Sequence, residues 1–141
     1  MSKVAIVYWS GTGNTQVMAR EVEKGARAAG ADVRVFNVDE FSAIQLDEYD
    51  AVGFGCPSMG TETLEESEFE PLFASCEPYL NGKKIVLFGS YGWGDGEWMR
   101  NWNERSKAAG AFLLAESLIV HEVPTPNDCK ACNALGKALA G

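Results

Sequence analysis

Ser10-Gly11-Thr12-Gly13-Asn14-Thr15 is the stretch on which the prediction of the fold depends. It follows an apolar run at residues 4–9, which is typical of a buried strand, and it precedes residues 17–22, where apolar side chains return at helical spacing. A turn of glycines and hydroxyl residues between a strand and a helix is well suited to bind a phosphate. The first N–H groups of a helix lack partners and attract an anion, and glycines let the backbone approach it closely.

The groups absent from this loop narrow the choice of ligand. No Lys ends a Gly-x-x-x-x-Gly-Lys run, which excludes the nucleoside-triphosphate loop, and the Gly-x-Gly-x-x-Gly dinucleotide fingerprint is absent as well. The loop contains no Lys or Arg, so all its donors are neutral. These donors suit one permanently held phosphate monoester better than a polyphosphate with its metal. The alternative is an ordinary Ser/Thr cap on a helix.

Composition and charge limit the class of protein. The chain has 141 residues, of which 46% are hydrophobic and 23% charged, as expected for one globular domain spanning residues 1–141. A net charge of −8 argues against nucleic acid or an anionic membrane as a partner, and favours a basic protein. No stretch has the apolar length of a membrane span, and residues 1–3 lead directly into a strand instead of a signal peptide. We therefore expect a cytoplasmic location.

Strand and helix signals alternate along the chain. Strands are expected at residues 3–9, 32–37, 50–55 and 84–90, with a broken fifth strand at 111–114 and 118–120. Helices are expected at 13–29, 65–76, 97–109 and 127–140, with a short helical turn at 40–47. Alternation of buried strands with helices predicts a single doubly wound α/β domain, in which a parallel sheet carries helices on both faces.

In such sheets, ligands bind beyond the carboxyl ends of the strands, where the strand order reverses. The segments in that position are residues 10–15, 56–62 and 90–95. All three are rich in glycine and small polar residues, and each has one large side chain in or beside it. These large residues are Trp9, Met59 and Trp93. The pattern predicts one pocket, in which a phosphate seat adjoins two loops that hold a planar ring.

The cysteines and the single histidine provide little further chemistry. Cys129 and Cys132 form a Cys-x-x-Cys, which can indicate redox chemistry or half of a metal site, or can simply begin a terminal helix. A zinc site would need two more ligands, and His121 is the only histidine. Ser10, Thr12 and His121 form no evident nucleophile–base pair, so neither catalytic residues nor a metal site are expected.

The three loops resemble those of one family. Residues 10–15 are similar to the FMN phosphate loop of flavodoxins. Residues 59–71 and 89–96 resemble the two flavin loops of the short-chain flavodoxins of anaerobic bacteria. The resemblance implies a five-stranded parallel sheet of order 2-1-3-4-5 and a non-covalently bound FMN. The FMN-binding residues that it implies are Ser10, Gly11, Thr12, Gly13, Asn14, Thr15, Pro57, Ser58, Met59, Gly60, Thr61, Glu62, Ser90, Tyr91, Gly92, Trp93 and Gly94.

The resemblance also implies roles for individual residues. Trp93 would stack on the solvent side of the flavin, and Met59 would pack against its inner face. The peptide after Gly60 would turn over on one-electron reduction, so that its carbonyl accepts a hydrogen bond from flavin N5. Glu62 would accept a hydrogen bond from flavin N3. Thr61 stands where relatives often have Asp or Asn, and a β-branched residue disfavours positive φ, so the cost of this turn is expected to differ.

The implied function is a low-potential one-electron carrier without substrate turnover of its own, cycling mainly between neutral semiquinone and anionic hydroquinone. The acidic residues at 62–70 would lower the second potential. They would also steer basic or iron–sulfur redox enzymes to the flavin edge beside Glu62, Glu65 and Glu66. Alternatively, these acidic residues form only the solvent-exposed face of a helix. Two other functions stay open, an FMN-dependent NAD(P)H:quinone reductase and a flavoprotein that activates one partner enzyme. A contact between Glu122 and FMN also stays open. The oligomeric state stays open too, and a monomer would suit a carrier that must expose the edge of its cofactor.

Overall fold

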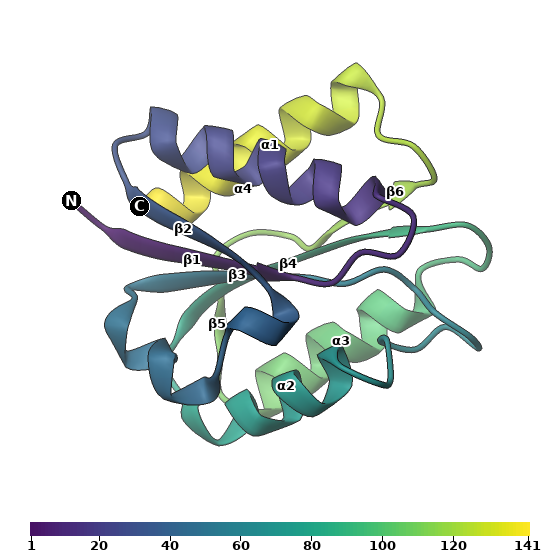
Figure 1. Ribbon diagram of the computed structural model, residues 1–141, viewed down its shortest axis with the longest axis horizontal. Helices are drawn as coiled ribbons and strands as arrows, with labels where there is room; N and C mark the ends of the chain where they lie inside the picture. Colours follow the sequence, from purple (N-terminus) through teal and green to yellow (C-terminus); the bar gives the residue numbers. More distant parts are fainter.

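The computed structural model describes residues 1–141, and its centre is a parallel β-sheet (Figure 1). The strand order β2-β1-β3-β4-β5 confirms the predicted order 2-1-3-4-5. A sixth strand, β6, pairs with β4 beyond the end of β5, so the predicted broken fifth strand is confirmed as two pieces beside one neighbour. The strands are β1 (Lys3–Tyr8), β2 (Asp32–Asn37), β3 (Ala51–Gly55), β4 (Lys84–Tyr91), β5 (Phe112–Leu113) and β6 (Leu118–His121).

Helices cover both faces of the sheet, as predicted. Figure 1 shows α1 (Asn14–Ala28) and α4 (Pro126–Ala140) on one face, and α2 (Phe69–Cys76) and α3 (Glu97–Ala108) on the other. Each face has its own hydrophobic core, because side chains alternate across a strand. None of the helices is both long enough and apolar enough to cross a membrane.

Two helical segments differ from the prediction. The turn expected at residues 40–47 is a pair of 3₁₀ turns, Val38–Glu40 and Ala43–Glu48, each with a capping box at its start. Helix α2 begins at Phe69 instead of Glu65. Its late start has a physical cause, since the Glu65 carboxylate accepts hydrogen bonds from the N–H groups of residues 67–69 at 2.7–2.9 Å. These bonds hold the segment before α2 in turns.

Helices α1 and α4 lie unusually close together. A Cβ on Gly25 would come within 2.0 Å of the Asn133 carbonyl oxygen, and one on Gly136 within 2.0 Å of the Val22 carbonyl oxygen. Glycine at these two positions therefore allows backbone-to-backbone packing. The Cys-x-x-Cys lies in the first half of α4. Cys132 is buried in the core beneath that helix, and burial raises the pKa of its thiol to about 12.

Candidate functional site

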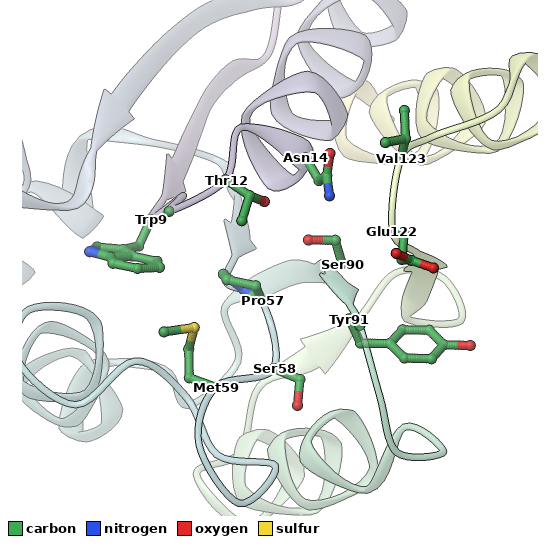
Figure 2. A pocket seen from close by; sticks show the side chains of 12 residues that line it. Trp9, Thr12, Asn14, Pro57, Ser58, Met59, Ser90, Tyr91, Glu122 and Val123 are labelled. Atoms are coloured by element: carbon green, nitrogen blue, oxygen red, sulfur yellow. The ribbon is translucent and has the colours of Figure 1, made fainter.

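A cavity of about 300 Å³ opens at the carboxyl ends of β1, β3 and β4, where all three predicted loops meet (Figure 2). The 12 residues that line it come from these loops and from the segment after β6. They are Trp9, Gly11, Thr12, Asn14, Pro57, Ser58, Met59, Ser90, Tyr91, Gly92, Glu122 and Val123. Figure 2 shows Trp9 and Glu122 on opposite sides of the opening.

The lining overlaps strongly with the predicted binding residues but does not match them fully. Among the predicted residues, those that do not line the cavity are Ser10, Gly13, Thr15, Gly60, Thr61, Glu62, Trp93 and Gly94. Trp9, Glu122 and Val123 were not among the predicted binding residues. Trp9 carried a weak signal, as an aromatic residue directly before the phosphate loop, whereas the late segment at residues 122–123 has no motif.

The first loop presents backbone donors at the start of α1. The Ser10 hydroxyl oxygen accepts hydrogen bonds from the N–H groups of Gly13 at 3.1 Å and Gln16 at 3.3 Å. Gly13, at φ +98°, makes the left-handed turn into the helix. The N–H groups of Thr12, Asn14 and Thr15 have no acceptor within the protein. Free N–H groups at the positive end of a helix are a suitable site for a phosphate.

Thr15 joins the first loop to the third. Its hydroxyl lies 2.9 Å from the Ser90 hydroxyl and accepts the Ser90 N–H at 3.3 Å, and both residues are buried. A buried hydroxyl pair needs such partners, because an unpaired polar group in the core costs about 1–3 kcal/mol. Thr15 therefore holds the start of α1 against the end of β4 at the edge of the cavity.

The second loop is a small hairpin. Met59 and Thr63 exchange two backbone hydrogen bonds of 2.8 Å, which fix both ends of residues 60–62. The left-handed positions within it are Gly60 at φ +54° and Glu62 at φ +57°. Thr61 does not have positive φ, so the strain expected from its β-branched side chain is absent from this turn.

The Glu62 carboxylate connects the second loop to the third. It accepts the N–H of Glu97, the first residue of α3, at 3.0 Å. A Cβ on Gly94 would meet the Glu62 carboxyl group at 2.5 Å, so glycine there leaves room for it. Glu62 therefore caps a helix whose own preceding residue, Gly96, has no side chain for that purpose.

The two large residues expected at the flavin are partly open to solvent. Trp93 is 62% exposed and Met59 is 37% exposed, and only Met59 lines the cavity. Trp9 lies across the cavity edge, where its indole N–H donates to the Glu68 carboxylate at 3.2 Å. This bond ties the end of β1 to the acidic segment before α2.

The acidic residues divide into exposed and structural groups. Glu65 is only 7% exposed, which corrects the expectation that it lies at an open docking edge. Burial raises the pKa of Glu65, but the N–H donors of Phe69, Glu68 and Ser67 outweigh it, so the net pKa is lowered. Glu70 is engaged as well, in a two-point ion pair with Arg105 at 2.6 Å. Glu66 is exposed and has no ion-pair partner.

Comparison with known proteins places this geometry in one family. The flavodoxin family model matches residues 6–136. The chain is 47% identical to the flavodoxin of Megasphaera elsdenii, over 97% of this chain and 98% of that one. It is 45% identical to the flavodoxin of Clostridium beijerinckii, over 96% and 97% of the two chains.

A solved structure supports the same family assignment. The solution structure of two-electron-reduced Megasphaera elsdenii flavodoxin superposes with a TM-score of 0.89 at 45% identity, covering 97% of this chain and 98% of that one. The sheet order, the three loops at its carboxyl edge and these full-length matches lead to one conclusion. The chain belongs to the flavodoxin family, whose members are electron carriers that bind FMN and turn over no substrate of their own.

Proposed function

We propose that this flavodoxin is a low-potential one-electron carrier that cycles its FMN mainly between neutral semiquinone and anionic hydroquinone. The observation that carries the proposal is the cavity at the carboxyl edge of the sheet. Free helix-start N–H groups lie there, next to a hairpin whose Gly60–Thr61 peptide has no hydrogen-bond partner within the protein.

The residues present fit FMN. The unpaired N–H groups of Thr12, Asn14 and Thr15 would hold its phosphate, with the hydroxyls of Ser10 and Thr12 beside them. Because these donors are neutral, they suit a permanently bound monoester. The flavin ring would lie between the second and third loops, against Met59 and beneath Trp93. We propose the whole set of predicted binding residues, joined by Trp9, as the cofactor site.

The second loop would tune the bound cofactor, which supplies the one-electron chemistry. Neither the Gly60 carbonyl nor the Thr61 N–H has a partner within the protein, whereas Met59 and Thr63 are fixed by their paired bonds. The Gly60–Thr61 peptide can therefore turn over without disturbing its neighbours. In one orientation of this peptide, the Gly60 carbonyl would accept a hydrogen bond from a protonated nitrogen of the flavin. Glycine permits both orientations of the peptide at low cost.

The electrostatics favour a low potential and a basic partner. Glu62, Glu66 and Glu68 lie near the cavity in a chain of net charge −8, and nearby negative charge disfavours an anionic reduced flavin. The same charge would attract basic or iron–sulfur redox proteins to the edge beside Glu62 and Glu66. The cytoplasmic location expected from the sequence and the monomeric state that would suit a carrier stay predictions.

An anaerobic reductive titration of the FMN-loaded protein, followed by visible absorption, tests the proposal. We expect a blue one-electron intermediate that accumulates before the protein bleaches. Direct two-electron bleaching, together with steady NAD(P)H oxidation by the protein alone, would support a quinone-type reductase instead. A protein that fails to retain FMN would overturn the cofactor assignment.

A further inference from the structure

We propose that His121 is a positioning residue for the cofactor site, because its imidazole anchors the third loop, residues 90–95, at the Gly92 carbonyl. The proposal rests on the proposed FMN site and extends it to the segment after β6, which no motif in the sequence identified. Figure 2 shows this segment, at Glu122 and Val123, beside Tyr91 at the cavity.

The end of β6 lies directly against the end of β4. Tyr91 and His121 are register partners in the two parallel strands, and their rings lie 5.1 Å apart. The Glu122 N–H donates to the Tyr91 carbonyl at 2.8 Å, just where the third loop begins. Glu122 has φ +58°, a strained conformation for a residue other than glycine, so the chain turns sharply at this contact.

The imidazole reaches one residue further along the loop. Nε2 of His121 lies 3.2 Å from the Gly92 carbonyl oxygen and 3.5 Å from Oε1 of Glu122. Both neighbours are acceptors, so Nε2 must bear a hydrogen whether the ring is neutral or charged. The neutral ring is therefore the tautomer with Nε2–H, which donates to the Gly92 carbonyl.

Together with the bond from the Glu122 N–H to the Tyr91 carbonyl, this bond fixes the start of the loop, and other contacts hold its far end. There, the Arg100 guanidinium donates to the Asp95 carbonyl at 3.0 Å and to its carboxylate at 2.9 Å, and Glu62 caps α3 at Glu97. Trp93 lies between the two anchors and is itself largely exposed. With His121 in place, the peptide that carries Trp93 has little freedom to move away from the cavity that Gly92 lines.

The test compares two substitutions that differ in one hydrogen-bond donor. His121→Leu removes the donor, whereas His121→Gln places an amide N–H₂ at about the same distance from the backbone. We expect His121→Leu to weaken FMN binding roughly two- to tenfold, the size of effect typical of one neutral hydrogen bond. Binding is measured by quenching of FMN fluorescence. Hydrogen exchange of the amides in residues 92–96 of the loaded protein should accelerate in parallel, and His121→Gln should restore both.

Asn127→Leu is the control for adding an exposed leucine, since Asn127 is exposed on α4 and makes no side-chain hydrogen bond. It should leave binding and exchange unchanged. Unaltered binding and exchange in His121→Leu would overturn the role of His121 while the proposed function stands. Equal losses in His121→Leu and His121→Gln would overturn the donor role and leave only ring packing against Tyr91. Failure of the unsubstituted protein to bind FMN would overturn the proposed function as well.

Discussion

The second loop contains two residues in the left-handed conformation, and only one of them is a glycine. Gly60 reaches φ +54° at no cost, whereas Glu62 at φ +57° carries strain that its carboxylate bond to the Glu97 N–H offsets. Gly60 and Glu62 therefore have different roles in one hairpin. Gly60 provides freedom to change conformation, and Glu62 fixes the hairpin to the start of α3.

Gly60→Ala should reduce the one-electron intermediate several-fold. A Cβ at this position meets only Thr63 Oγ1, at 3.9 Å, so the methyl group fits and the cost is conformational. Left-handed backbone costs a residue with Cβ about 1–2 kcal/mol, which changes an equilibrium roughly 5- to 30-fold. The measurement is the maximum of the intermediate in an anaerobic reductive titration.

Gly82→Ala is the matched control. Gly82 also has positive φ, +76°, in open space, but it lies before β4, at the opposite edge of the sheet from the cavity. It should lose comparable folding stability and titrate like the unsubstituted protein. If Gly60→Ala also titrated normally, the turning of this peptide would play no part in tuning the cofactor.

The start of α2 depends on one buried carboxylate. Three N–H groups donate to Glu65, and they lower its pKa despite burial. A carboxylate with a lowered pKa in the folded protein stabilises the fold above its unfolded-state pKa. That contribution is lost as the pH falls through the folded-state value.

Glu65→Gln should therefore lower the free energy of unfolding at neutral pH by about 1.5–3 kcal/mol, the size expected for hydrogen bonds to a charged acceptor. The difference from the unsubstituted protein should shrink as the medium becomes acidic. Urea unfolding at several pH values measures both effects. Glu66→Gln, at the exposed neighbour, is the control and should change little at any pH. A constant difference across the acid range would show that the charge of Glu65 contributes nothing.

The close packing of α1 and α4 reverses the usual effect of replacing glycine by alanine within a helix. Ala in place of Gly within a helix usually stabilises it by about 1 kcal/mol. At Gly136, however, the new Cβ would lie 2.0 Å from the Val22 carbonyl oxygen, and a backbone atom has little room to move. We expect Gly136→Ala to destabilise the fold by about 1–3 kcal/mol in urea unfolding. Increased stability would mean that the two helices separate easily.

The fold as a whole places exposed Glu66 at the same end of the sheet as the cavity, whereas other exposed acidic residues lie elsewhere. Glu66 lies in the turn after the second loop, whereas Glu48 closes the 3₁₀ turn before β3, at the opposite edge of the sheet. Both are exposed, so equal charge changes at the two sites test whether position matters.

Glu66→Lys should slow electron transfer from the reduced protein to cytochrome c, a basic acceptor, several-fold more than Glu48→Lys does. The difference should fade as ionic strength rises, because salt screens the attraction that guides encounter. Stopped-flow mixing at low and high salt measures it. Equal rates for the two variants at low salt would show that net charge, and not the edge near the cavity, controls encounter.

Most of the architecture could be predicted because it depends on local patterns. Continuous apolar runs identified β1, β3 and β4, and the glycine- and hydroxyl-rich loop at residues 10–15 lies at the carboxyl end of the first strand, as expected. The broken fifth strand was predicted as well, since residues 115–117 interrupt an apolar pattern that resumes at residue 118, and both pieces pair with β4. The bounds of α1, α3 and α4 were predicted to within one residue, whereas α2 begins later because a side chain competes with the helix, and the turn expected at residues 40–47 is two 3₁₀ turns.

What the pattern of residues could not provide were contacts between distant segments. The same glutamate-rich stretch contains a buried cap at Glu65, an ion pair at Glu70 and an open carboxylate at Glu66, and nothing local distinguishes them. Glu122 and Val123 reach the cavity only because β6 pairs with β4. The order of strands and helices follows from periodicity within short windows, so the chain alone specifies it. The partner of each polar side chain depends on which segments the folded sheet brings together.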